Sequence, residues 1–491
     1  MVEFEAKMQN YFGLLYMFYF EFLKVKFFIN ILRQGSYLVY YSIKLINLIN
    51  RIFYIFWLSI SVFFTYNINA QEFKLFGNTE SETMSFKLIN NLIILPVEVN
   101  GTKLTFLLDS GVSSPVIFNL TSSDSLKLIH TQKIQLRGLG EGEPVEALFS
   151  KNNRFKIGNV YGNNQDLYLI YNDKLDLSAK LGITVHGIIG YDLLKDFIVT
   201  INYITRKITF SKPEKYKYKK CRKCKTIDLE FLKNKPYVNA FIDFNTPVEK
   251  SMEVKLLIDS GGTDSLWLFE DDEIVIPENA FEDFIGEGVS GSIFGMRSKV
   301  KSFSLSSFEF KSPNVAYLDS LSSLHAKKVQ GRNGSLGAEI LRRFKIIFDY
   351  PNSKITLKKN SNFKDKFNYN MSGIEIMYDG KKLVKELNQT TFQIESDNSI
   401  GENNITFDYS YKFQLKPVYK IAYVRKNSPG ELAGVREGDY LLKVNGRHSY
   451  NFKLTDIISK FYEKENDIVK LLIERNGKEI EVEFRLKNLL K

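Results

Sequence analysis

The sequence predicts a mainly β protein with two similar lobes related by a pseudo-two-fold axis, followed by a smaller α+β domain. Three observations support this fold class. Apolar segments of strand length alternate with turns rich in glycine and asparagine. An apolar strand that ends in Asp-Ser-Gly occurs twice, at Asp109 and again at Asp259. A glycine-rich turn and a Gly-x-apolar-Gly strand follow each copy in the same order, about 150 residues apart, which indicates an internal duplication.

Length and composition describe a globular protein with a large core. The chain has 491 residues, of which 44% are hydrophobic and 25% charged, enough for about three domains. The net charge of +11 is spread along the chain, and the lysine-rich run 215–220 is expected to be a solvated linker without a nucleic-acid motif. Cys221 and Cys224 lack a second pair, which disfavours zinc and leaves a short disulfide or two free thiols. We expect no cofactor and no metal.

Residues 1–70 are expected to be a leader. An apolar run at 52–66 follows Lys44 and Arg51 and precedes Ala70, which is the pattern of a secretory signal. The run is shorter than the roughly 20 residues that a membrane-spanning helix needs. We therefore expect an exported protein, periplasmic or extracellular, with an uncleaved N-terminal membrane anchor as the alternative.

The first lobe is expected over residues 71–218. Asn100-Gly101 predicts a tight hairpin turn before the strand that delivers Asp109. A turn carrying Gly138, Gly140 and Gly142 predicts the tip of a mobile hairpin, or flap. The remaining elements are strands at 86–88, 92–95, 104–108, 197–201 and 207–210, and a strand that turns into a short helix at 187–194.

The second lobe is expected over residues 219–362 and repeats this order. Its glycine-rich turn carries Gly286 and Gly288, followed by Gly291. That spacing matches a dinucleotide-binding pattern, but it leads into strand-like residues rather than a helix, so we reject that function. The other elements are strands at 237–243, 254–258, 344–348 and 354–357, and a strand and short helix at 334–341.

The duplicated Asp-Ser-Gly loops predict a catalytic centre. Burying one carboxylate is costly, but Asp109 and Asp259 meeting on the axis would share a proton. One member could then act as a base on water while the protonated member polarises a carbonyl group. The hydroxyls of Ser110 and Ser260 could brace the opposite loop. Gly111 and Gly261 would let the backbone approach closely, and the glycine-rich hairpins would close over an extended peptide.

Residues 86–357 resemble the retropepsin-type aspartic proteases, fused in tandem as in pepsin-like enzymes. The run 187–194 is similar to the second signature of that family. The resemblance implies a two-lobed acid-protease β-barrel fold, a monomeric catalytic unit and a protein or peptide substrate. It also implies that Asp109 and Asp259 are the catalytic pair. The sequence departs from the family at three points: serine replaces the usual threonine in both loops, Ser335 replaces a common aliphatic residue, and the hairpin tips lack a tyrosine. These departures bear on catalytic efficiency rather than on the class of protease.

The residues after the two loops predict the pH range of activity. Val112 and Gly262 stand where pepsin-like loops often carry a further hydroxyl. With fewer hydrogen-bond donors to stabilise the ionised carboxylates, the lower of the two pKa values of the aspartate pair should rise. We therefore expect activity at mildly acidic to neutral pH.

The C-terminal domain is expected over residues 363–491. The run 424–446 resembles a PDZ domain of the bacterial protease-associated type, a fold that binds extended peptides or C-termini at a sheet edge. Residues 454–462 predict the helix that lines the peptide site, and Ser372–Ile376 the loop that binds a carboxylate, with 379–415 as an insertion. The candidate peptide-binding residues are Gly373, Ile374, Ile376 and Ile458. Glu375 would repel a carboxylate, and the alternative is a domain that only packs against the protease.

These features lead to one principal hypothesis and two alternatives. The principal one is an exported bacterial aspartic endopeptidase whose PDZ domain docks substrate or regulates the enzyme. The first alternative is an exported peptide-binding protein that keeps both folds without turnover. The second is a serine protease with a PDZ domain, but none of the histidines, at 130, 186, 325 and 448, accompanies a nucleophile-elbow motif.

Overall fold

The computed structural model describes residues 45–56 and most of 71–490. Within the second range the undescribed positions are 121–125, 138–142, 171–176, 246–250, 289–290, 319–322, 324–325, 328, 330 and 398–401; positions 21 and 24 are also described. The chain divides into two compact units, Met1–Ala70 and Gln71–Lys491. In the first, residues 45–56 are helical, and none of the helices described in the chain is long and apolar enough to cross a membrane. The expected cleavage site near Ala70 lies outside the described residues.

The first lobe is organised around a sheet in which β5 pairs in parallel with β10 and antiparallel with β4. Asn100 and Gly101 join β4 to β5 with φ values of 49° and 88°, the positive angles that a tight hairpin turn requires. The strands of this sheet are β1 (Glu72–Leu75), β3 (Lys87–Ile89), β4 (Leu92–Val99), β5 (Thr102–Leu108), β6 (Val116–Ile117), β7 (Thr131–Leu136), β8 (Val145–Ile157), β9 (Val160–Ile170) and β10 (Gly187–Ile189).

The second lobe repeats this arrangement, with β16 parallel to β23 and antiparallel to β15. A short helix follows the parallel strand in each lobe, α4 (Tyr191–Leu194) in the first and α6 (Ala338–Leu341) in the second. The first lobe also carries α3 (Leu177–Leu181). The strands of the second sheet are β14 (Glu230–Leu232), β15 (Lys235–Asp243), β16 (Ser251–Ile258), β17 (Leu266–Phe269), β18 (Phe281–Gly288), β19 (Gly291–Lys299), β20 (Ser302–Leu305), β21 (Phe308–Lys311), β22 (Asn314–Leu318) and β23 (Arg332–Leu336).

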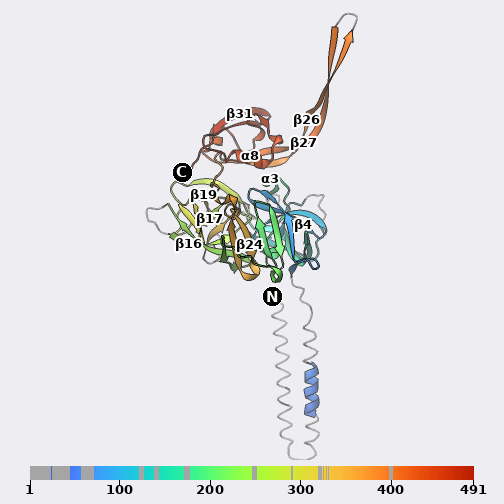
Figure 1. Cartoon of the computed structure of the whole chain (residues 1–491), viewed down its shortest axis with the longest axis vertical. Coiled ribbons are helices and arrows are strands. Elements are labelled where there is room, and N and C mark those ends of the chain that lie inside the picture. Colours follow the sequence, from blue (N-terminus) through green and yellow to red (C-terminus); the bar gives the residue numbers. More distant parts are fainter. Residues whose placement is uncertain are drawn as a thin grey trace, which may run out of the picture. The chain divides into compact units, whose positions relative to one another are not determined.

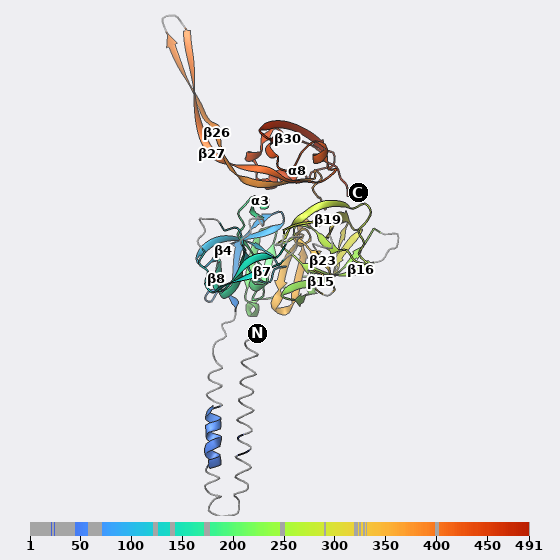
Figure 2. The same cartoon turned by 180° about the vertical axis from the view of Figure 1, so that it is seen from behind.

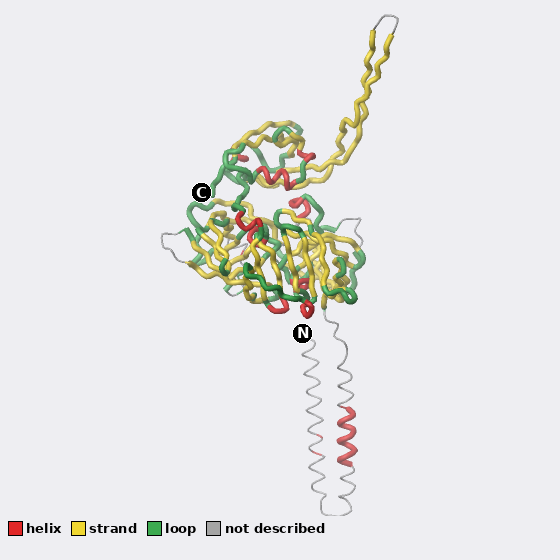
Figure 3. Tube along the Cα trace, viewed as in Figure 1, coloured by secondary structure: helices red, strands yellow, loops and turns green. Residues whose placement is uncertain are grey.

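A third sheet joins the two lobes. Strand β11 of the first lobe pairs antiparallel with β24 of the second, with Thr200 opposite Ile347. Apolar side chains from both lobes meet in one core cluster that includes Phe197, Phe210 and Phe344. The two lobes therefore fold around a shared sheet, which contains the strand β24 labelled in Figure 1, and strands make up most of both lobes (Figure 3). The strands are β2 (Ser81–Ser85), β11 (Ile198–Asn202), β12 (Lys207–Ser211), β13 (Cys224–Asp228), β24 (Phe344–Asp349) and β25 (Lys354–Lys359).

The C-terminal domain has a sheet of its own and a separate apolar core. Residues 379–397 and 402–415 of the expected insertion belong to a long β26–β27 hairpin, drawn in orange, that extends from the domain (Figures 1 and 2). The mainly β fold class with a C-terminal α+β domain is confirmed. The elements are β26 (Ile374–Asp397), β27 (Glu402–Val424), α7 (Pro429–Leu432), β28 (Tyr440–Val444), β29 (Arg447–His448), α8 (Leu454–Lys460), β30 (Ile468–Arg475) and β31 (Lys478–Arg485).

Candidate active site

Equivalent strands deliver the two aspartates of the duplicated motif. Strand β5 ends immediately before Asp109, and β16 ends immediately before Asp259. The N–H of Asp109 donates to the carbonyl oxygen of Ile189 on β10 at 2.9 Å, and that of Asp259 donates to Leu336 on β23, also at 2.9 Å. Each loop is therefore held by the parallel strand beside it, at the same point in each lobe.

The two serines connect the loops reciprocally. The hydroxyl of Ser110 donates to the carbonyl oxygen of Ile258 at 2.7 Å and accepts the N–H of Ser260 at 3.0 Å. The hydroxyl of Ser260 donates to the carbonyl oxygen of Leu108 at 2.9 Å and accepts the N–H of Ser110 at 3.0 Å. Both serines are buried, so these four hydrogen bonds fix the spacing of the loops.

The same hydrogen bonds argue against a serine nucleophile at these loops. Each hydroxyl hydrogen is already donated to a main-chain carbonyl, so Ser110 and Ser260 have no neighbouring base to activate them. The imidazole Nδ1 of His186 accepts the N–H of Thr105 at 3.0 Å, within the first lobe. Its contacts are those of a structural residue.

Glycines bring each carboxyl group against the opposite loop. The N–H of Gly111 donates to Oδ1 of Asp109 at 2.7 Å, whereas Oδ1 of Asp259 accepts from Gly261 at 3.0 Å and Gly262 at 2.9 Å. A Cβ atom on Gly261 would lie 2.4 Å from Cγ of Asp109, and one on Gly111 would lie 3.5 Å from Cγ of Asp259. The carboxyl groups therefore lie across the axis from each other, and Gly261 leaves room for Asp109.

The electrostatics of the pair favour one shared proton. Burial, followed by the charge of Asp259, raises the pKa of Asp109 to about 8, while the N–H of Gly111 and the ammonium of Lys235 oppose that rise. Asp259 accepts two backbone N–H groups and Asp109 accepts one, so the negative charge is better solvated on Asp259. The arrangement therefore suits a proton held on Asp109, whose raised pKa follows from burial and from the neighbouring carboxyl group.

Lys235 is a residue near this pair that the sequence reasoning missed. The register of β15 and β16 pairs Tyr237 with Leu257, so Lys235 lies opposite Asp259. Burial lowers the pKa of Lys235, and its charge interacts with both aspartates. The equivalent register in the first lobe places the apolar Leu92 at that position. Aligning the two copies residue by residue would have exposed this difference.

Replacing Lys235 with leucine is expected to move the basic limb of any pH–rate profile to higher pH. The lysine charge lowers the pKa of Asp109, so its removal makes the shared proton harder to lose. Activity should therefore persist further above pH 8 than in the wild type. The measurement is kcat/KM against pH, with Lys311→Leu, an exposed strand lysine, as the charge-matched control. A basic limb that stays in place would show that Lys235 does not act on the pair.

Arg332 explains the unusual serine in the second lobe. Its Nη2 donates to Oγ of Ser335 at 2.7 Å, and its Nε donates to the carbonyl oxygen of Gly334 at 3.1 Å. The guanidinium also stacks over the ring of Phe269, 5.1 Å from the centroid. The hydroxyl that replaces an aliphatic side chain thus anchors a cation in this lobe.

Of the predicted flap glycines, only Gly286 and Gly288 lie among the described residues. Gly138, Gly140 and Gly142 lie outside the described residues, beyond the end of β7. Gly286 and Gly288 lie on β18, which pairs with β19, and the pairing register shifts next to Gly286. A Cβ atom there would lie 3.9 Å from Trp267, an ordinary contact. The structure therefore places the second set on a hairpin, as expected of a flap.

The second hairpin is tied to the first lobe through α3. The ammonium of Lys180 lies 2.6 Å from Oε1 of Glu287 and 3.9 Å from the ring centroid of Phe284. Both partners belong to β18. Because this ion pair is partly buried, it is screened less by solvent than an exposed pair.

The expected carboxylate loop of the C-terminal domain has its N–H donors already satisfied. Oδ1 of Asn370 accepts the N–H groups of Ser372 and Gly373 at 3.1 and 3.2 Å, and Oγ of Ser372 accepts the N–H of Ile374 at 3.0 Å. Glu375 accepts from the amide of Asn370 at 3.0 Å, and burial raises its pKa to about 7. The N–H groups of Ser372, Gly373 and Ile374 are therefore already engaged within the loop.

The other predicted peptide-binding side chains also have partners within the chain. Ile374 and Ile376 are buried in the core of the domain, and Ile458 is partly buried against it. Helix α3 of the first lobe contacts β26, and a Cβ atom on Gly182 would lie 2.9 Å from Cβ of Leu454 at the start of α8. The elements expected to border the peptide site, β26 and α8, therefore both contact the first lobe.

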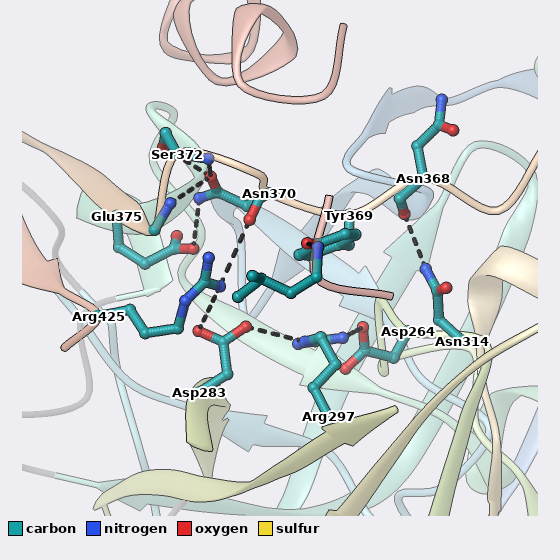
Figure 4. Close-up of polar contacts among 12 residues, drawn as sticks. Asp264, Asp283, Arg297, Asn314, Asn368, Tyr369, Asn370, Ser372, Glu375 and Arg425 are labelled. Carbon is teal, nitrogen blue, oxygen red and sulfur yellow. Dashed lines mark hydrogen bonds and ion pairs between the residues drawn. The ribbon is translucent and has the colours of Figure 1, made fainter. Parts of the chain in front are cut away.

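Charged side chains connect the C-terminal domain to the second hairpin (Figure 4). Nη1 of Arg425 lies 3.4 Å from Oδ1 of Asp283 on β18, and its guanidinium lies over the ring of Phe281 at 4.6 Å. Arg297 on β19 then bridges Asp283 and Asp264, with both contacts at 2.9 Å. Since Asp264 follows Asp259 by only a few residues, the network runs from the candidate active site to the C-terminal domain.

Family comparisons identify two domains. The aspartyl protease family model matches residues 95–193, and the PDZ domain model matches residues 420–475. These matches confirm the two resemblances drawn from the sequence. Among solved structures, an aspartic proteinase from Irpex lacteus matches 59% of this chain and all of its own length, with 13% identity and a TM-score of 0.38. No curated protein matches the chain.

Proposed function

We propose, from the premise that an aspartyl protease domain and a PDZ domain share one chain, that the protein is an aspartic endopeptidase. The observation that carries this proposal is the reciprocal bonding of Ser110 and Ser260, which holds Asp109 and Asp259 together across the axis. The raised pKa of Asp109 keeps one proton on the pair near neutral pH. A pair with one proton can supply a base and an acid at the same time.

The chemistry follows from that single proton. Ionised Asp259 removes a proton from water, whose oxygen attacks the scissile carbonyl carbon, while Asp109 gives its proton to the carbonyl oxygen. The resulting gem-diol collapses when a hydroxyl proton returns to Asp109 and Asp259 protonates the departing nitrogen. The C–N bond breaks, and the pair regains its starting protonation. Because the two carboxyl groups titrate as one unit, these roles describe the pair in its favoured microstate.

The test is digestion of a diverse peptide mixture by the full chain at pH 5 to 7. We expect internal cleavage that a statine-type transition-state mimic blocks and that Asp109→Asn abolishes. A serine-directed covalent inhibitor should have no effect. A protein that binds the statine peptide tightly but cleaves nothing would favour the peptide-binding alternative, and cleavage that survives Asp109→Asn would refute the dyad.

For the PDZ domain, the contacts support regulation of the protease over capture of free C-termini. The N–H groups of its loop are satisfied internally by Asn370 and Ser372, and Glu375 would repel a carboxylate. The domain instead contacts α3 and the β18–β19 hairpin. Arg425 contributes to this junction through its ion pair with Asp283 on β18.

Replacing Arg425 with leucine is expected to increase turnover of short peptides several-fold. The change removes the ion pair to Asp283, so β18 and β19 should open more readily, and flap opening often limits turnover. The measurement is kcat for the full-length variant, with Arg436→Leu, elsewhere on the same domain, as the control. Unchanged or reduced turnover would show that the docked PDZ domain does not restrain the hairpin.

The disulfide between Cys221 and Cys224 supports the proposal that the protein works in an oxidising compartment. The sequence left open whether these residues are bonded or free, and the structure joins them. Export to the periplasm or the outside of the cell would provide such a compartment. Mass spectrometry after alkylation under non-reducing conditions measures this bond in protein isolated from its native compartment.

A further inference from the structure

The outer part of the β26–β27 hairpin carries large apolar side chains that are exposed to solvent. Each of them is between 50% and 64% exposed. We call this set the hairpin face. Its members are Leu383, Leu387, Phe392, Ile394, Ile405, Phe407, Tyr409, Tyr411, Phe413 and Leu415.

The strand register places these side chains on one side of the hairpin. Directly opposite residues in an antiparallel pair point to the same face, as Phe392 and Phe407 do, with ring centroids 6.4 Å apart. A register shift between Leu387 and Gln389 keeps the two halves of β26 in phase with β27. The other side is polar, with an ion pair of 3.2 Å between Lys416 and Glu386. The hairpin is therefore amphipathic.

A surface of this kind is unusual on a protein that works alone. Ten half-exposed side chains present on the order of 1,000 Å² of apolar area, more than the few hundred Å² of a typical exposed patch. An isolated two-stranded hairpin in water is also marginally stable, so this length of hairpin needs a partner that covers its apolar side. The area is close to the roughly 800 Å² that each partner contributes to a stable protein interface.

The charge pattern along the hairpin indicates which partner fits. The end near the PDZ core is basic in sequence, and the end near the turn is acidic. The basic residues are Lys381, Lys382, Lys385, Lys412 and Lys416, and the acidic ones are Glu395, Asp397 and Glu402. Two copies placed face to face in opposite directions would align the basic segment of each with the acidic segment of the other, and Glu395, Asp397 and Glu402 alternate with the apolar set in the register, so this pairing would flank the apolar contact.

A lipid surface fits this pattern less well. Acidic residues next to the turn would be repelled by anionic headgroups and would be costly to insert into a bilayer. Lys385 lies on the same side of the hairpin as the hairpin face, and its ammonium, 3.9 Å over the ring of Tyr411, is compatible with an aromatic partner.

We propose that the hairpin face is a dimerisation surface, at which two copies of this chain pack their hairpins face to face in antiparallel orientation. The interface is isologous, so the same residues are buried on both copies. It lies on the PDZ domain and does not contain the candidate active site, so the dimer does not depend on the proposed protease activity.

The test compares the full chain with two matched double variants by light scattering coupled to size-exclusion chromatography. Phe392→Lys with Phe407→Lys places two charges on the hairpin face. Gln393→Lys with Thr406→Lys places the same charges on the neighbouring cross-strand pair of the polar face. We expect the wild type and the polar-face variant to be dimers at micromolar concentration. The hairpin-face variant should dissociate, with a dissociation constant raised at least 100-fold.

Three results would overturn the proposal. One is a wild type that remains monomeric at tens of micromolar. Another is equal dissociation of the two variants, which would mean that the added charge, and not the loss of apolar contacts, causes the dimer to dissociate. The third is a monomeric wild type that floats with anionic phospholipid vesicles and loses this binding in the hairpin-face variant, which would assign the surface to a membrane. Circular dichroism of each variant confirms that the fold is intact.

Discussion

Replacing Asp259 with asparagine is expected to lower kcat by at least about 1,000-fold while the protein stays folded, because in the proposed mechanism Asp259 is the base that activates water. Asparagine has the same shape and can still accept the N–H groups of Gly261 and Gly262. The loss should therefore fall on kcat, with little change in the affinity for a substrate-like peptide. Steady-state kinetics together with a thermal melt of the same preparation measure both quantities.

The matched control is Asp228→Asn, an exposed aspartate at the end of β13. This variant removes the same charge from the same chain at a distance from the pair, so its kcat should remain near the wild-type value. If Asp259→Asn and Asp228→Asn behaved alike, water activation would have to be assigned to another group. A large drop in melting temperature for Asp259→Asn would mean that the carboxylate is structural.

Replacing Gly261 with alanine is expected to reduce cleavage by at least about 100-fold. The new methyl group would lie 2.4 Å from Cγ and from Oδ2 of Asp109, closer than any van der Waals contact allows. Because the serine hydrogen bonds hold both loops in place, the carboxyl group of Asp109 must move away from Asp259. Overpacking of this kind costs about 1–3 kcal/mol of stability, so the fold should survive while the geometry of the pair does not.

Gly262→Ala is the comparison that isolates this steric effect. It lies next in sequence, and its Cβ atom would meet Cγ of Asp259 at 3.4 Å, an ordinary contact. Both variants lose the same backbone freedom, so the difference in kcat/KM between them reports the clash with Asp109. Equal losses would place the cause in loop flexibility, and the proposed contact across the axis would then be wrong.

The parts of the candidate site that the sequence predicts are those carried by local pattern. Asp109 and Asp259 stand out because each follows a strand and because the motif is repeated at matched positions. The tight turn at Asn100 is predictable for a similar reason, since positive φ favours asparagine and glycine. Duplication makes such signals stronger, because each copy supports the interpretation of the other.

The features that escaped prediction depend on contacts between distant segments. Lys235 acquires its place beside Asp259 only through the register of two strands, which no local pattern encodes. The contact of Arg425 with Asp283 needs the packing of one domain on another. The donors of the loop at Gly373 were predicted to bind a ligand, but Asn370 already accepts from that loop at close range. A sequence motif does not show whether a side chain of the same chain already accepts the N–H group that a ligand would need.

The difference between Leu92 and Lys235 has a consequence for how a chain with two similar lobes evolves. A homodimer built from one gene must present identical residues on both sides of its symmetry axis. In this single chain each half mutates independently, so the same register position holds a lysine in one half, whose charge interacts with both carboxyl groups, and a leucine in the other. A single chain can thus give its two aspartates different surroundings, which two identical subunits could do only through the asymmetry of a bound ligand.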